Sequence, residues 1–333
     1  MNKIRLLVNL PPTFFTHPRL EGQFQRLRGM AEVRQTSHNI LEEILPDLPW
    51  AQAVIMWAWP ILDEEILAGL PELRFVGQIN TMEKTARACL ARGITLSEAR
   101  RCWSPAVAEM ALALILSGLR KISDYHAAMR QGKETWVRQH PADIDPLERE
   151  LSGLEVGIIG FGGIGQRLAQ LLEPFGVRLS VYDPYLPAGV AEQFKVAQLP
   201  LIDLIRGSDV VVLAAANNPR NRHMIGEEEM AAFRKDAVLV NVARSMLIDM
   251  EALQRRLEKG DLIALLDVFD KEPLEADSPL RGIPNAYLTP HRAGGLLSSV
   301  ERGLTMLVDD LEAYLEGREL CYKVTEEMFI SFA

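Results

Sequence analysis

Residues 154–176 read LEVGIIGFGGIGQRLAQLLEPFG, an apolar run followed first by glycines and then by a helical pattern. Gly160, Gly162 and Gly165 give the spacing G-x-G-x-x-G directly after the apolar run. In a unit of strand, turn and helix, these glycines allow a tight turn, a close backbone approach to phosphate and close packing of the helix on the strand. The stretch therefore predicts a parallel α/β domain in which the helix amino terminus holds a pyrophosphate.

Asp183 ends the next apolar run, VRLSVYD, about twenty residues further along. A carboxylate at that strand end accepts hydrogen bonds from an adenosine ribose diol and repels a 2′-phosphate, so we expect NAD as the cofactor in preference to NADP. The alternative is a glycine-rich turn in an ordinary strand and helix unit, with Asp183 solvated. Titration with NADH separates the two, because only the first binds it.

Outward from this unit, strand-like and helix-like stretches alternate in two series. Such alternation is typical of parallel sheets with crossover helices, so the expected fold class is α/β with two parallel-sheet domains. The candidate strands are IRLLVNL, AQAVIMWAW, LRFVGQI and GITLSEA in the first series and EVGIIGFG, RLSVYD, DVVVLAA, AVLVNVA, LIALLDV and AYLTP in the second.

The two series are joined by SPAVAEMALALILSGLRKISDYHAAMRQG, residues 104–132. Ser104 is a suitable N-cap and Pro105 suits the first helical position, so we predict one long, mostly buried helix here. Residues 136–153 are polar and contain prolines, which predicts a connection over the surface.

Composition narrows the class of partner. The 333 residues, 48% of them hydrophobic, suit a two-domain globular protein, and the net charge of −9 disfavours nucleic acid or an anionic membrane. A small molecule is therefore the expected class of partner. Cys89, Cys102 and Cys321 lie far apart without a CxxC pair, so we expect no metal site, no disulfide framework and a reducing cytoplasm. The N-terminal apolar run is too short to span a membrane and has no cleavage site, so we expect a first strand.

Reactive side chains follow three consecutive predicted strands of the second series: Arg244, then Asp267 and Glu272, then His291. A guanidinium can grip a carboxylate with two hydrogen bonds, and a histidine can donate a proton to a developing alkoxide. A nearby carboxylate favours the protonated histidine. Taken singly, each residue also suits an ordinary surface or turn position. Together they fit the reduction of a 2-keto acid.

From about residue 100 to residue 295 the chain resembles the D-isomer-specific 2-hydroxyacid dehydrogenase family, of the glyoxylate/hydroxypyruvate reductase type. The resemblance is carried by AVAEMALALIL, LSGLEVGIIGFGGIGQRLA, VYDP, VLVNVARSMLIDMEAL, LLDVFDKEPLEADSPL and NAYLTPHRAGG. It implies hydride transfer between NAD(H) and a 2-keto or D-2-hydroxy acid. Arg244 would anchor the substrate carboxylate, His291 would act as acid and base, and Glu272 would be the partner of His291.

The resemblance also implies an architecture of two doubly wound domains. A Rossmann-type NAD-binding domain, 101–294, would be inserted into a flavodoxin-like substrate domain, 1–100 and 295–333, and the chain would form homodimers through the segment before the glycine motif. The implied cofactor contacts are Gly160, Phe161, Gly162, Gly163, Ile164, Gly165, Asp183, Ala216, Ala243 and Asp267. The implied substrate contacts are Gln78, Ile79, Asn80 and Arg244.

The chain departs from the family pattern in four places. QINTMEKTARA replaces a glycine-rich substrate loop, so positive φ is less accessible and the amides of Gln78 to Asn80 are less suited to holding a carboxylate. ANNPRN, residues 216–221, stands where the family has PLTPET, and VAEM and ARSM stand for VAEH and ARGG. None of these changes removes Arg244, Glu272 or His291.

Several alternatives stay open. The altered substrate loop favours an NADH-sensing binding protein, whereas the complete set of Arg244, Glu272 and His291 favours the enzyme. A phosphite or formate dehydrogenase on the same scaffold is a further possibility, formate being disfavoured because its oxidation has no alkoxide proton. Trp57 and Trp59 share one face of a strand end and serve either core packing or a pocket for a large 2-keto acid. Arg292 is a surface cation or a contact for a second anion.

Overall fold

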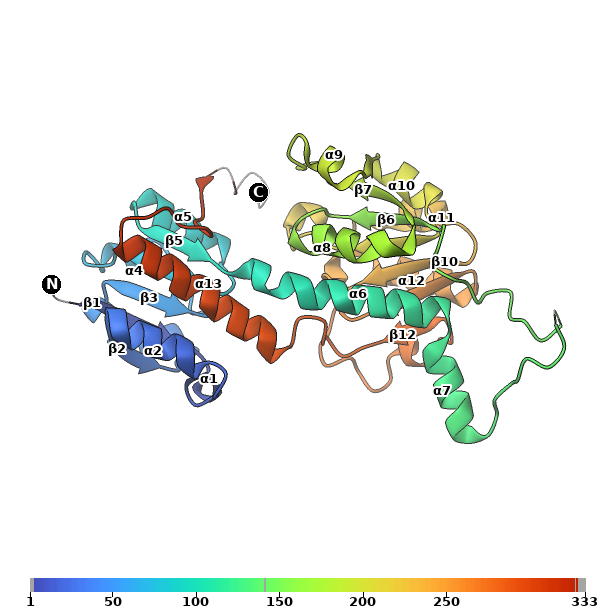
Figure 1. Cartoon of the computed structure of the whole chain (residues 1–333), viewed down its shortest axis with the longest axis horizontal. Helices are drawn as coiled ribbons and strands as arrows, with labels where there is room; N and C mark the ends of the chain where they lie inside the picture. The colour runs from blue at the N-terminus through green and yellow to red at the C-terminus, as the bar shows by residue number, and fades with distance from the viewer. Residues whose placement is uncertain (1–2, 141, 327, 329–333) are drawn as a thin grey trace. The chain divides into compact units, whose positions relative to one another are not determined.

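The computed structural model describes residues 3–140, 142–326 and 328 of the chain (Figure 1). It divides into two compact units, one formed by Met1–Trp103 with Leu296–Ala333 and the other by Ser104–Gly295. Each unit contains one parallel sheet with helices between its strands. The predicted fold class, α/β with two doubly wound parallel sheets, is confirmed.

The first unit has a five-stranded sheet in the order β2-β1-β3-β4-β5, with every pair parallel. This is the flavodoxin-like order. The strand β2 was not predicted, because its sequence AEVRQT is half polar and it lies at the edge of the sheet with one buried residue, Ala31. The strands are β1 (Ile4–Asn9), β2 (Ala31–Thr36), β3 (Ala53–Met56), β4 (Phe75–Gln78) and β5 (Thr95–Glu98).

The last long helix of the chain, α13 (Leu297–Leu315), completes the core of this first unit. Its buried Leu304, Leu307 and Leu311 pack in one cluster with Leu6 of β1 and Phe24. The other helical segments of the unit are α1 (Pro12–Phe15), α2 (Glu21–Met30), α3 (Leu41–Ile44), η1 (Leu48–Trp50), α4 (Glu64–Ala68), α5 (Glu83–Ala91) and η2 (Arg100–Trp103).

The second unit has a seven-stranded parallel sheet in the order β12-β11-β10-β9-β6-β7-β8. The chain order reverses at β6, and ligands of such sheets bind beyond the strand carboxyl ends at that reversal. The short β8, like β2, was not predicted. The strands are β6 (Glu155–Ile159), β7 (Arg178–Tyr182), β8 (Ala197–Gln198), β9 (Val210–Leu213), β10 (Ala237–Asn241), β11 (Leu262–Leu266) and β12 (Ala286–Leu288).

The single long helix predicted for residues 104–132 is wrong. The structure has two helices, α6 (Ser104–Leu119) and α7 (Ile122–Gln131), separated at Lys121, whose φ of +47° is left-handed. Lys121 Nζ pairs with Asp145 at 2.5 Å, which holds the turn. No residue of α7 is buried, and Figure 1 shows α7 extending away from the seven-stranded sheet.

The helix α6 is apolar because it is a core helix of its unit. It packs against α8, β10 and β11. The stretch Arg100–Leu119 is long and apolar enough to cross a membrane by length and composition, but half of its most apolar window is buried within the protein. Of the predicted surface connection 136–153, residue 141 lies outside the described residues, and the rest contains no regular helix or strand. The remaining helical segments of the unit are α8 (Gly163–Leu172), η3 (Glu173–Phe175), α9 (Val190–Phe194), α10 (Leu201–Gly207), η4 (Pro219–Asn221), α11 (Glu227–Ala232), η5 (Ser245–Leu247), α12 (Met250–Glu258) and η6 (Pro279–Gly282).

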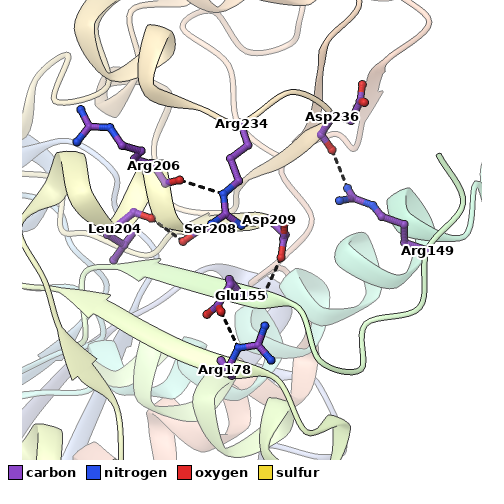
Figure 2. A network of polar contacts seen from close by, with 9 residues as sticks. All are labelled: Arg149, Glu155, Arg178, Leu204, Arg206, Ser208, Asp209, Arg234 and Asp236. Atoms are coloured by element: carbon purple, nitrogen blue, oxygen red, sulfur yellow. Dashed lines mark hydrogen bonds and ion pairs between the residues drawn. The ribbon is translucent and has the colours of Figure 1, made fainter. Parts of the chain in front are cut away.

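A polar network ties together the amino ends of the strands in the second unit (Figure 2). The Asp209 carboxylate, just before β9, accepts hydrogen bonds from the Glu155 backbone N–H at 2.9 Å and from Arg234 Nη1 at 3.1 Å. Arg178 Nε donates to Glu155 Oε1 at 2.6 Å, and Arg149 Nη2 donates to the Asp236 carbonyl at 2.7 Å. These contacts stabilise the amino ends of the strands, whereas the glycine turn lies at their carboxyl ends.

Candidate active site

The glycine turn between β6 and α8 contains two glycines that the fold itself requires. Gly160 has φ +89°, and a Cβ there would lie 2.4 Å from Ala215 Cα at the end of β9. A Cβ on Gly165 would lie 2.4 Å from the Gly160 carbonyl oxygen. Gly162, the N-cap of α8, has nothing within 4 Å of its Cβ position. Gly160 and Gly165 therefore allow close packing, and Gly162 leaves the helix start open to a ligand.

Asp183 follows β7 and connects it to the glycine turn. Its Oδ2 accepts a hydrogen bond from the Phe161 N–H at 2.8 Å, and its Oδ1 accepts one from the Tyr185 N–H at 2.9 Å. A carboxylate offers about four acceptor positions, so lone pairs remain for a ribose diol. Asp183 thus combines a structural role, which the sequence did not reveal, with the position expected for a ribose-binding acid.

His291 and Glu272 form a close pair. His291 Nδ1 lies 2.6 Å from Glu272 Oε2, and Glu272 Oε1 accepts a hydrogen bond from the Phe269 N–H at 3.0 Å. The two side chains are 45% and 35% exposed, so both are accessible to a ligand. Since the pair uses Nδ1, the other ring nitrogen, Nε2, is left for a second partner.

The electrostatics of the pair favour a negative Glu272. Burial alone would raise the pKa of Glu272, but hydrogen bonds from His291 and Phe269 and the charges of His291 and Arg244 lower that pKa below its ordinary value of 4.5. Arg244 contributes the smallest of these effects, and its guanidinium bonds to the Ala243 carbonyl and not to the pair. The structure therefore brings the acid and the histidine into direct contact, and the joint role of Arg244 stays a prediction.

Asp267 holds the turn that carries His291. Its fully buried carboxylate accepts hydrogen bonds from Thr289 Oγ1 at 2.6 Å, the Arg292 N–H at 2.9 Å and the Ala293 N–H at 2.8 Å. The Asp267 carbonyl accepts a fourth from the His291 N–H at 2.8 Å. His291 has a φ of +49°, and these bonds stabilise that left-handed backbone. The predicted contact of Asp267 with a nicotinamide carboxamide stays a prediction.

Asn241 holds the backbone turn that carries Arg244, and this role was not predicted from the sequence. This fully buried residue ends β10, accepts a hydrogen bond from the Ala243 N–H at 3.1 Å and donates one to the Arg244 carbonyl at 2.9 Å. The exposed guanidinium of Arg244 bonds back to the Ala243 carbonyl at 2.6 Å. The signal in the sequence was an amide within the otherwise apolar run AVLVNVA, because a buried polar side chain needs partners.

An apolar cavity of about 600 Å³ adjoins the histidine and glutamate pair. Pockets of this size hold small organic molecules. The polar residues in its lining are Glu272, Arg281, Thr289 and His291. The remaining lining is mostly apolar; the lining residues are Phe269, Glu272, Pro273, Leu274, Arg281, Leu288, Thr289, Pro290 and His291.

The predicted substrate contacts Gln78 to Asn80 belong to the first unit. Gln78 is fully buried and, among the described residues, neither polar atom of its side chain has a hydrogen-bond partner. The Ile79 N–H donates to the Met56 carbonyl at 3.2 Å, and Asn80 Oδ1 accepts a hydrogen bond from Trp103 Nε1 at 2.9 Å. The amide of Ile79 is therefore already engaged, because this bond continues the pairing of β3 with β4.

Trp57 and Trp59 are neighbours in the first unit, with ring centroids 6.0 Å apart. Trp57 packs on the core cluster and on Phe14, whereas Trp59 is 41% exposed and donates from Nε1 to Asn39. Core packing accounts for Trp57. Arg292 is exposed, and its backbone N–H, not its side chain, contacts Asp267.

Known proteins are similar to this chain over most of its length. The model of the D-isomer specific 2-hydroxyacid dehydrogenase NAD binding domain matches residues 112–293. D-3-phosphoglycerate dehydrogenase of Methanocaldococcus jannaschii is 30% identical over 91% of this chain and 57% of its own length. Glyoxylate reductase of Thermococcus gammatolerans is 30% identical over 92% of this chain and 93% of its own. A phosphoglycerate oxidoreductase structure from Rhizobium etli superposes with a TM-score of 0.81, at 26% identity, over 97% of this chain and 99% of that one.

A doubly wound sheet with a glycine turn and an acid at the next strand end is the arrangement of a dinucleotide-binding domain. The chain belongs to the D-isomer specific 2-hydroxyacid dehydrogenase family. It spans 57% of the length of the phosphoglycerate dehydrogenase with which it aligns.

Proposed function

We propose that the chain interconverts a 2-keto acid and its D-2-hydroxy acid with NAD(H), and that the unit 104–295 binds the cofactor. The observation that carries the proposal is the 2.6 Å contact between His291 Nδ1 and Glu272, next to Arg244. A proton donor, the acid that keeps it charged and a carboxylate anchor are the groups that this reduction needs.

Each residue of the proposed site has a separate role in the reduction. Bound NADH supplies the hydride to the carbonyl carbon. Arg244 holds the substrate carboxylate and orients the carbonyl group, while His291 donates the Nε2 proton to the carbonyl oxygen as it gains negative charge. Glu272 stabilises the imidazolium before that transfer. In oxidation the same Nε2 takes the hydroxyl proton back, so His291 serves both directions.

We assign NAD rather than NADP as the preferred cofactor on the strength of Asp183, whose carboxylate suits a free ribose diol. The glycine turn, Phe161 to Gly165, would hold the pyrophosphate, and Ala216, Ala243 and Asp267 would contact the rest of the dinucleotide. We further propose a homodimer, located in the cytoplasm, that acts on small-molecule acids.

An NADH-sensing binding protein is the second candidate. The specific observation in its favour is the Gln78 to Asn80 segment, in which the Ile79 N–H already bonds to the Met56 carbonyl. Such a loop is less able to capture a carboxylate through its amides. The sensor, however, has no chemical need of the Glu272 and His291 pair.

The deciding experiment measures NADH oxidation with glyoxylate, hydroxypyruvate, pyruvate, phenylpyruvate and 2-ketoglutarate, for the wild type and His291→Ala. We expect the variant to lose about a hundredfold or more of kcat/KM, the size of a missing general acid. His223→Ala is the matched control, since His223 is also exposed and also has positive φ. Tight NADH binding without turnover of any acid would instead favour the sensor.

A further inference from the structure

The loop after β9 brings an arginine to the strand end that carries Asp183. Arg220 Nη1 lies 3.3 Å from the Tyr185 hydroxyl, and the Tyr185 N–H is bonded to the Asp183 carboxylate. Because β6 lies between β7 and β9 in the sheet, this contact joins the loops on either side of the glycine turn. A cation therefore lies beside the position expected for the adenosine half of a dinucleotide.

The backbone that carries Arg220 is fixed by the loop itself. Asn218 is 3% exposed, and its Oδ1 accepts a hydrogen bond from the Arg220 N–H at 2.9 Å. Asn221 Nδ2 donates to the Ala216 carbonyl at 3.0 Å, and Pro219 restricts the turn. The Arg220 side chain is exposed, and no carboxylate of residues 3–140, 142–326 or 328 lies within ion-pair distance of it. It is a positioned cation without an anionic partner in the described chain.

Asp183 is a weaker barrier to a 2′-phosphate here than a bare carboxylate would be. Each of its oxygens accepts a backbone N–H, from Phe161 and from Tyr185, and those dipoles partly compensate its charge. The family pattern PLTPET also has an acid where this chain has Arg220, so the loop charge next to Asp183 is reversed. Both features reduce the repulsion of an added phosphate.

We propose that Arg220 and the Tyr185 hydroxyl bind the 2′-phosphate of NADP(H), so that the chain accepts NADPH beside the preferred NADH. The inference rests on the proposed cofactor site and adds a second anion subsite to it. A guanidinium forms paired hydrogen bonds with phosphate oxygens, and a phenol adds a third donor. Stacking of Arg220 on the adenine ring is the competing role, and it would serve both cofactors equally.

The test is a fluorescence titration of NADH and of NADPH into the wild type, Arg220→Gln and Tyr185→Phe. Arg222→Gln is the matched control, because Arg222 is an exposed arginine two positions further along the same loop. We expect Arg220→Gln to weaken NADPH binding about tenfold or more and NADH binding less than about twofold, as for a lost charged hydrogen bond. Tyr185→Phe should give a smaller loss in the same direction, and Arg222→Gln should leave the NADPH to NADH ratio unchanged.

Competition by adenosine 2′,5′-bisphosphate and by AMP gives a second readout without the nicotinamide. The bisphosphate should compete better with the wild type than with Arg220→Gln, and AMP should compete equally with both. Equal weakening of NADH and NADPH, or an unchanged ratio, in Arg220→Gln overturns the phosphate role while leaving the proposed function intact. Failure of the wild type to bind either dinucleotide removes the cofactor site itself, and the proposed function with it.

Discussion

Both carboxylate oxygens of Glu272 are engaged. One contacts the His291 ring, and the other accepts a hydrogen bond from the Phe269 N–H. Replacing it by glutamine keeps the shape but removes the charge that favours imidazolium. We expect Glu272→Gln to fold normally and to lower kcat/KM of keto-acid reduction about a hundredfold. Glu275→Gln is the matched control, because Glu275 lies in the same loop and its carboxylate pairs with the exposed Lys271 and not with His291. Equal activities of the two variants would exclude the pairing role.

The same pair predicts the direction of the acid dependence. The pKa of Glu272 is lowered from 4.5, so the carboxylate stays ionised at neutral pH and the pair contributes fully there. That contribution is lost only as the pH falls through the lowered pKa. In a pH series of kcat/KM, with fluorescence reporting folding, we expect any loss attributable to Glu272 to be centred below pH 4.5. For keto-acid reduction, a decrease of kcat/KM with falling pH that is centred near neutral pH in the wild type and absent in Glu272→Gln would contradict this assignment.

Substitution of the buried Asp267 tests whether the turn that carries His291 depends on this carboxylate. Asp267→Asn replaces one acceptor oxygen by an NH2 group, which opposes the N–H of Arg292 or Ala293. We expect a loss of about 2 kcal/mol in the free energy of unfolding, measured by urea denaturation, together with loss of activity. Asp270→Asn, at an exposed position in the loop that follows, should change neither. Unchanged stability of Asp267→Asn would show that the turn holds without the carboxylate.

The roles of single residues could be predicted from the sequence where residue type and position after a strand indicate the chemistry. Glu272 and His291 come together because parallel strands end at one edge of the sheet, and Arg244 follows a neighbouring strand of that sheet. Asn241 and the bond from the Phe161 N–H to Asp183 were not predicted. Their roles depend on which backbone groups lie within reach, and that is decided only when β10 and β7 take their places in the sheet.

At the scale of the element, the turn from β6 to α8 separates a packing glycine from a binding glycine. Gly160→Ala places a Cβ against the Ala215 backbone at a positive φ, so we expect a clear loss of thermal stability. Gly162→Ala meets no protein atom and should remain stable, yet weaken NADH binding by crowding the helix start. Thermal unfolding and NADH titration of both variants check this, with Gly207→Ala, also in open space, as the control. Equal stability of the first two would refute the distinction.

The elements most visible in the sequence were the strands that lie in apolar runs. The strands other than β2 and β8 lie within the predicted apolar runs. Both exceptions are edge strands with few apolar residues, so their pairing comes from the neighbouring strand and not from their own pattern. The break between α6 and α7 escaped prediction for a related reason. Lys121 is an ordinary helix former, and its left-handed backbone is stabilised by Asp145, which lies 24 positions away.

At the scale of the whole molecule, we expect the proposed dimer to use the exposed apolar side chains between residues 122 and 147. They are 36% to 59% exposed, and they are Ile122, Tyr125, Met129, Trp136, Val137, Ile144 and Leu147. We expect Met129→Glu combined with Trp136→Glu to give a monomer in sedimentation velocity, because charges would be buried at the interface. Ile40→Glu, at a position 53% exposed in the first unit, should stay dimeric. A double variant that sediments like the wild type would move the interface elsewhere.

The late position of α13 in the chain has a consequence for biosynthesis. Leu304, Leu307 and Leu311 complete a core whose other members include Leu6 and Phe24. During translation, the nascent first unit must therefore wait, with one apolar face uncovered, until the whole of Ser104–Gly295 has been made. The inserted unit can fold during that interval, since its own core is already complete. While α13 is still being made, a folded unit Ser104–Gly295 is therefore attached to an incomplete first unit. That intermediate is the species most exposed to aggregation and to chaperone binding.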